Sequence, residues 1–137
     1  MLGEYKTQDN ASTAIRFKHY LWNTGIRALN RAVENTLRGD SYGSVSYHLG
    51  RGFTALADYM SIYGAAAAEE VRSFLSAHLD SVAEVVASVA TPAGAGRGPL
   101  SELVRAASNR LFSRIDAMLA AADASQDVGL ALEELRQ

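Results

Sequence analysis

Apolar residues recur every three or four positions along most of this chain, which is the period of an α-helix. No stretch shows the sustained alternation of apolar and polar residues that a half-buried strand needs. The only two prolines, Pro92 and Pro99, lie close together and interrupt the helical pattern at one place. The pattern therefore predicts an all-α protein.

Capping residues divide the first half of the chain into two long helices. The first is expected over 12–38, and Gly39 follows it as a residue that can adopt the left-handed conformation without a Cβ clash. Asp40 or Ser41 then caps a second helix, which Gly64 closes. Because the connection is so short, we expect these two helices to form a hairpin.

The second half of the chain contains one clear linker. A third helix is expected to begin within "AAAAEEV" (65–71) and to end before Pro92. The segment 91–99, "TPAGAGRGP", reads as a flexible and basic connection because it is rich in glycine and contains an arginine. A fourth helix is expected over 100–122, and the apolar spacing after "ASQD" (124–127) allows a short fifth helix.

Four long helices with short connections predict an antiparallel bundle with a short C-terminal fifth helix. A single domain covering residues 1–137 fits this length, since a chain of this size can bury a core without disulfides or metal. The linker leaves two arrangements open. The fourth helix folds back on its own chain, or it crosses to a second copy in a domain-swapped dimer.

The second helix carries two different faces. A bulky apolar stripe passes straight through "HLGRG" (48–52), which favours a helix there over a phosphate-binding loop, because such loops follow a strand. Beside this stripe lies a face made only of small residues, where another backbone could come close, either within the bundle or on another chain. We predict a partner-binding surface on this face, at Gly43, Ser46, Gly50, Thr54 and Ala57.

Composition narrows the class of protein only slightly. The chain has a net charge of −2, so it is no general binder of polyanions, and it lacks cysteine, which excludes disulfides and thiolate metal sites. No apolar run approaches the ~18 residues that a membrane span needs, and the first residues do not resemble a signal peptide. We therefore expect a cytoplasmic protein with no membrane partner.

The first helix is strongly basic, and this motivates an alternative function. Arg27, Arg31 and Arg38 share a face with Tyr20 and Asn23. A basic helix with an aromatic residue is a candidate nucleic-acid surface, so these three arginines are the alternative RNA-binding residues. The same pattern also suits a solvated face that is balanced by acidic residues of the third helix.

The sequence contains no convincing catalytic or metal-binding set. There is no HExxH pair, no Glu-x-x-His pair and no G-x-S-x-G element, so no metal and no cofactor are expected. Arg72 and His78 in "RSFLSAH" resemble the R-x4-6-H motif of HEPN-domain ribonucleases, which are small helical bundles. The resemblance implies RNA cleavage, in which Arg72 stabilises phosphate charge and His78 moves the proton.

A second resemblance covers the predicted hairpin, from Leu21 to Gly64. Its basic and apolar helix, its Gly-Asp turn and its stripe of tyrosine and leucine are similar to the first hairpin of flagellin export chaperones. That resemblance implies a helical surface that binds a partner protein.

Together these patterns favour a non-enzymatic interaction protein. We expect an assembly subunit, chaperone or adaptor that binds a partner protein or a second copy through a helix face. The alternative is an RNA-binding domain, a HEPN-like ribonuclease or a small helical subunit of a ribonucleoprotein. A ligand-binding bundle is a third class, with a pocket lined by the aromatic residues Tyr20, Trp22, Tyr42, Tyr47, Phe53 and Tyr59.

Overall fold

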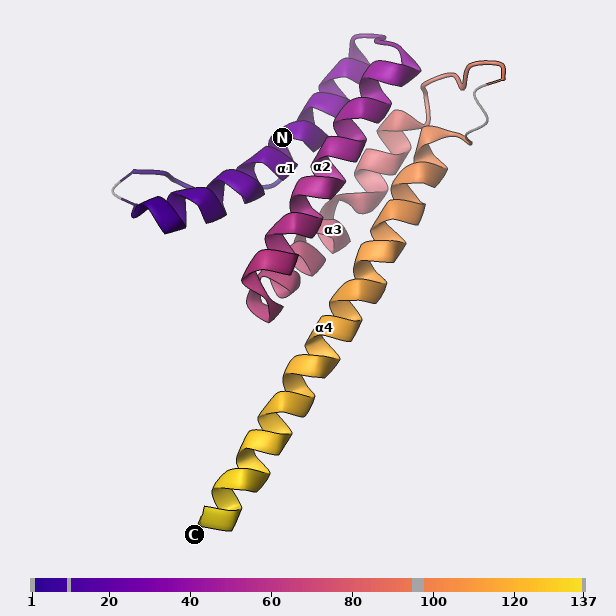
Figure 1. The fold of residues 1–137 in the computed structure, drawn as a ribbon. Helices are drawn as coiled ribbons and strands as arrows, with labels where there is room; N and C mark the ends of the chain where they lie inside the picture. Colours follow the sequence, from indigo (N-terminus) through magenta and orange to yellow (C-terminus); the bar gives the residue numbers. More distant parts are fainter. Residues whose placement is uncertain (1, 10, 95–97, 137) are drawn as a thin grey trace.

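The computed structural model describes residues 2–9, 11–94 and 98–136, and this part of the chain contains helices and no strand. The all-α prediction is therefore confirmed for these residues. The fold consists of α1 (Thr13–Leu37), α2 (Tyr42–Tyr63), α3 (Ala65–Val86) and α4 (Leu100–Arg136) (Figure 1). Within the predicted linker, residues 95–97 lie outside the described residues.

The helix ends follow the local sequence signals. Ser12 caps α1 by accepting a hydrogen bond from the Ile15 N–H, and Ser41, rather than Asp40, caps α2 by accepting from the Ser44 N–H. Gly39 has φ of +79° and Gly64 has φ of +81°, a conformation that side chains with a Cβ rarely adopt. Gly64 alone joins α2 to α3, so these two helices turn back on each other within one residue.

Consecutive helices run in alternating directions, and each contributes one apolar side to a shared core (Figure 1). α1 packs mainly against α2, and α3 packs mainly against α4. The fourth helix therefore folds back on its own chain. The centre of the core is made of fully buried side chains from all four helices, including Ile26, Leu56, Tyr59, Val71, Val104 and Ile115.

α1 and α2 approach each other closely at Gly25 and Gly52. A Cβ built on Gly52 would lie 2.8 Å from two carbon atoms of Leu29 and 3.2 Å from the Gly25 carbonyl oxygen. A Cβ on Gly25 would lie 2.9 Å from Leu56. These glycines let the hairpin close tightly. Gly43 and Gly50, which belong to the predicted small-residue face, have no such neighbour within 4 Å.

The predicted fifth helix is wrong, because α4 continues without a break to Arg136. Nothing in 124–127 forces the helix to stop, since alanine is a strong helix former and no proline follows. Gly129 alone costs roughly 1 kcal/mol and does not end the helix. We call residues 117–136 the arm. Figure 1 shows that α4 extends well beyond the other three helices, and from Asp123 to Arg136 every residue of the arm is exposed.

The segment before α1 is held along α1 by two asparagine side chains spaced seven residues apart. The Asn30 amide accepts a hydrogen bond from the Leu2 N–H (2.7 Å) and donates to the Leu2 carbonyl oxygen (3.3 Å). Asn23 accepts from the Lys6 N–H (2.6 Å) and donates to its carbonyl oxygen (2.9 Å). Each amide thus satisfies both backbone groups of one residue, as a neighbouring strand would.

Removal of either asparagine amide should destabilise the fold. We expect Asn23→Ala or Asn30→Ala to lower the free energy of unfolding by about 1–3 kcal/mol, because each leaves backbone groups without partners. Urea denaturation measures this effect, and hydrogen exchange should accelerate at Leu2 and Lys6. Asn109→Ala, on the exposed side of α4, is the matched control, and we expect a change within about 0.5 kcal/mol. Equal effects at all three positions would contradict the role of Asn23 and Asn30 in holding the N-terminal segment along α1.

Candidate interaction groove and basic pocket

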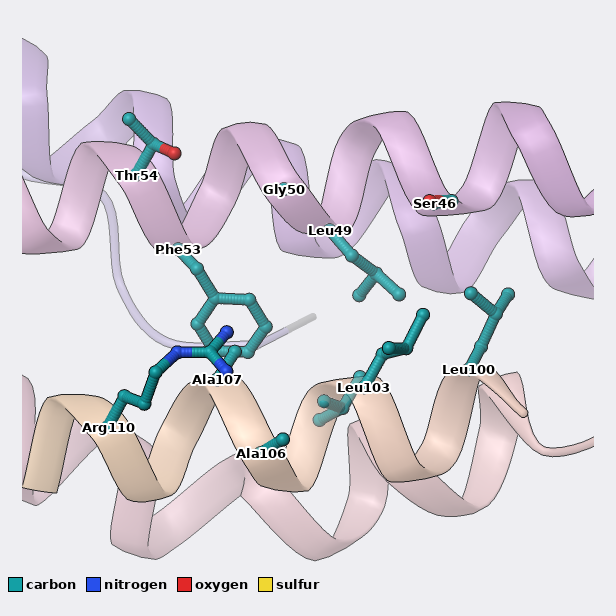
Figure 2. Close-up of a pocket in the computed structure, with 11 residues that line it drawn as sticks. Ser46, Leu49, Gly50, Phe53, Thr54, Leu100, Leu103, Ala106, Ala107 and Arg110 are labelled. Atoms are coloured by element: carbon teal, nitrogen blue, oxygen red, sulfur yellow. The ribbon is translucent and has the colours of Figure 1, made fainter. Parts of the chain in front are cut away.

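A groove of about 320 Å³ lies between α2 and the first half of α4. Figure 2 shows Leu49 and Phe53 reaching from α2 toward α4, while Leu100 and Leu103 point back from α4. Its walls are mainly apolar, and Arg110 is the only charged residue among those that line it. A cavity of this kind suits an apolar segment flanked by acidic groups.

The predicted partner-binding residues divide between the groove and its surroundings. Ser46, Gly50 and Thr54 line the groove, at a spacing of four residues along α2. Their small size leaves it open, and a Cβ on Gly50 would meet nothing within 4 Å. Gly43 is exposed beyond the groove, and Ala57 is half-buried against the core. The small-residue face is therefore partly a cavity wall and not a tight helix contact within the chain.

The arm carries an apolar stripe on the same side of α4 as the groove. Successive helical residues turn by about 100°, which places Leu103, Ala107 and Arg110 of the groove on this side. The same count places the apolar residues of the arm there: Ala117, Ala121, Ala124, Val128, Leu132 and Leu135. The exposed fraction is 60% for Val128, 54% for Leu132 and 83% for Leu135. The sequence analysis missed this stripe because it divided the arm between two helices.

The acidic residues of the arm lie away from its apolar side. The arm carries Asp123, Asp127, Glu133 and Glu134 and a single basic residue, Arg136. The same helical count places these four carboxylates about 120–160° around the helix from the groove side. The first half of α4 carries both signs of charge, with Arg105, Arg110 and Arg114 beside Glu102 and Asp116. Of these arginines, Arg110 and Arg114 lie on the groove side.

A second pocket, of about 270 Å³, is basic and lies between α1 and α2. It is lined by Thr24, Arg27, Ala28, Arg31, His48 and Arg51. The structure thus joins two of the predicted RNA-binding arginines to Arg51 and His48 of "HLGRG", which the sequence analysis had not connected with them. The sequence could have indicated that His48 and Arg51 lie side by side, because residues three apart on a helix are neighbours. Arg38 lies elsewhere, with its guanidinium 3.4 Å from Asp40.

The surroundings of His48 in this basic pocket lower the pKa of its imidazole. Burial lowers the pKa of the imidazole below its usual value of 6.5, and the positive charges of Arg31 and Arg51 lower it further. No carboxylate is among the residues that line the pocket. Within the described part of the chain, none of Arg27, Arg31 and Arg51 forms an ion pair with an acidic residue.

Arg72 and His78, the candidate ribonuclease pair, point to different surroundings. Arg72 donates a hydrogen bond to the Asp116 carboxylate on α4. His78 packs on Phe74, with ring centroids 4.9 Å apart, beside a surface hollow that Trp22 also lines. Six residues on a helix separate two side chains by about 120° around its axis. The structure does not bring this pair together within one chain.

The six aromatic residues predicted to line one ligand pocket do not lie together. Trp22, Tyr42 and Tyr59 are buried in the core, Tyr20 and Tyr47 are exposed, and Phe53 lines the groove between α2 and α4. Tyr59 is fully buried and lies 5.4 Å from Trp22 between ring centroids. Its hydroxyl donates to Glu70 (2.7 Å), which also binds the Lys6 ammonium (2.6 Å). Burial of the Glu70 carboxyl raises its pKa, but the hydrogen bonds from Lys6 and Tyr59 and the lysine charges together lower it below its usual value. This network ties α2, α3 and the N-terminal segment together.

No group of three or more histidine or acidic residues in the described ranges is arranged to hold a metal ion. Among those same residues, no helix has the length and apolar character needed to cross a membrane. No protein-family model matches the sequence, and neither the curated proteins nor the solved structures contain a significant match to the chain.

Proposed function

We propose that this chain is a non-enzymatic helical assembly subunit that pairs with a second copy through α4. The arm of each protomer lies in the groove between α2 and α4 of the other. The observation that supports this function is that the apolar stripe of the arm and the groove lie on the same side of α4. From Asp123 onwards the arm has no partner in the described chain, and the groove on that side is open and mainly apolar.

An antiparallel pair of α4 helices satisfies both surfaces at once. Residues 117–136 of the arm span about 30 Å at 1.5 Å per residue, and α2, which forms one wall of the groove, is about as long. When two identical helices run in opposite directions, each arm meets the first half of the other helix. Such a two-fold contact closes on itself and buries both apolar stripes.

The groove supports the antiparallel direction over the parallel one. Only an antiparallel pair brings each arm to the groove of the other protomer. A parallel pair would place each arm beside the other arm and leave both grooves open. The acidic residues of the arm lie about 120–160° around α4 from its apolar stripe, so they stay in water when the stripe enters the groove.

Cysteine cross-linking tests the geometry, and the native chain has no cysteine to interfere. Ala117 lies on the apolar side, close to the middle of α4, where the two-fold axis would pass. We expect Ala117→Cys to form an intermolecular disulfide under mild oxidation, because disulfides need Cα atoms within about 7 Å. Leu135→Cys, on the same side but at the end of the arm, is the matched variant and should stay unlinked. Linking at residue 135 without linking at residue 117, or at neither position, would contradict the antiparallel pair.

A further inference from the structure

We propose that the basic pocket between α1 and α2 binds the phosphate group of a small phosphorylated molecule. Arg31 of α1 and Arg51 of α2 line it from two helices, and Thr24, Arg27 and His48 are also part of its lining. This site is separate from the groove and does not depend on the assembly function.

Thr24 provides the first observation that points to a ligand. Thr24 is among the residues that line the pocket, and its Oγ1 is buried without a hydrogen-bond partner among the described residues. In a helix, a threonine hydroxyl normally donates to the carbonyl four residues earlier, as Thr36 does to Ala32 at 2.8 Å. A buried hydroxyl without a partner is unfavourable. A phosphate oxygen in the pocket would accept its hydrogen bond.

The arginines provide the second observation. Arg31 and Arg51 are close enough to His48 to lower the pKa of its imidazole, so positive charge is concentrated in the pocket. Guanidinium groups bind phosphate oxygens through paired, charge-assisted hydrogen bonds. Arg27 is partly engaged elsewhere, since its guanidinium lies 5.7 Å from the centre of the Tyr5 ring. The principal anion ligands are therefore Arg31 and Arg51.

The shape of the site favours one phosphate group over a nucleic-acid backbone. The pocket is a single compact cavity of about 270 Å³. Arg38, which would extend a basic track along α1, is paired with Asp40 and also donates to Asn35. Several phosphates in a row would need such a track, because RNA binding gains affinity from each phosphate that is neutralised.

Titration calorimetry with inorganic phosphate and with sulfate tests the site on the full chain. We expect both anions to bind, and Arg31→Gln or Arg51→Gln to weaken binding by about tenfold or more, which corresponds to about 1.4 kcal/mol per charge-assisted contact. Thr24→Val should also weaken binding. Arg16→Gln is the matched control, since Arg16 is exposed on α1 outside the pocket, and it should change the affinity by less than about twofold.

The pH dependence of sulfate binding isolates His48, since sulfate keeps its charge between pH 6 and 8. The groups that line the pocket around His48 are Arg27 and Arg31 of α1 and Arg51 of α2, and the Tyr47 ring packs on its imidazole. In the empty pocket, burial first and then the charges of Arg31 and Arg51 lower the pKa of the imidazole. A bound anion offsets their charge and raises the pKa, so affinity should increase as pH falls, and His48→Gln should remove this dependence.

Three results would overturn the proposal. The first is no binding of phosphate or sulfate at millimolar concentration. The second is equal weakening by Arg16→Gln and Arg31→Gln, which would indicate diffuse attraction by the whole surface. The third is binding of a single-stranded RNA oligonucleotide whose affinity rises with its length and falls steeply with salt, which would assign the surface to nucleic acid instead.

Discussion

Gly52→Ala should destabilise the protein by about 1–3 kcal/mol, although alanine is the better helix former. The new methyl group would lie 2.8 Å from Leu29 Cγ and Cδ2 and 3.2 Å from the Gly25 carbonyl oxygen. Leu29 is buried and cannot move away freely, and the carbonyl belongs to the α1 backbone. The two helices of the hairpin must therefore separate, which loosens the contact between α1 and α2. Urea denaturation measures the loss in the free energy of unfolding.

Gly43→Ala is the matched control on the same helix. Gly43 is exposed, and a Cβ there would meet nothing within 4 Å. Its substitution should leave stability unchanged or raise it by up to about 1 kcal/mol through helix propensity. If Gly52→Ala stabilised the protein as Gly43→Ala does, the close approach of α1 and α2 at Gly25 and Gly52 would be wrong.

Leu132→Glu should weaken the proposed dimer by at least about thirtyfold, or about 2 kcal/mol. Leu132 lies on the apolar stripe of the arm, so in the antiparallel pair its side chain would be buried against the groove of the other protomer. A carboxylate there would lose its water without gaining a matched partner. The fold itself should persist, because Leu132 is exposed within the single chain. Sedimentation equilibrium measures the dissociation constant, and circular dichroism checks the helix content.

Leu130→Glu is a control with the same chemistry on a different side of the arm. Leu130 is 60% exposed, much like Leu132, but two helical residues turn the side chain about 160° away from the stripe. We expect dimerisation to change by less than about threefold. Equal losses from both substitutions would show that general acidity of the arm, and not burial of the stripe, controls association.

The helices and their caps could be predicted from sequence because they depend on local signals. Ser12, Gly39, Ser41 and Gly64 act within one turn of their own positions, so their roles were visible without knowledge of the fold. The end of α4 was harder. "ASQD" contains residues that often cap helices. Such residues end a helix only where the chain also changes direction, and α4 continues straight through this segment.

The groove and the basic pocket depend on which helices pack together and in which register. Local sequence patterns do not show this. Gly50 and Gly52 are nearly adjacent in sequence, yet Gly52 closes the hairpin and Gly50 lines an open groove. The basic pocket needed the register between α1 and α2 to bring Arg31 beside Arg51. The hydrogen bonds of Asn23 and Asn30 to the N-terminal segment could not be predicted either. An asparagine within a helix has no preferred partner until the fold places another backbone beside it.

The molar mass of the unsubstituted 137-residue chain tests the central proposal most directly. Sedimentation equilibrium across a range of concentrations should show a reversible shift from the 14.7 kDa chain to twice that mass, with no larger species, because a two-fold pair closes on itself. A chain that stays monomeric at every concentration up to the millimolar range would contradict the α4 pair. Masses that continue to grow beyond the dimer would contradict it as well.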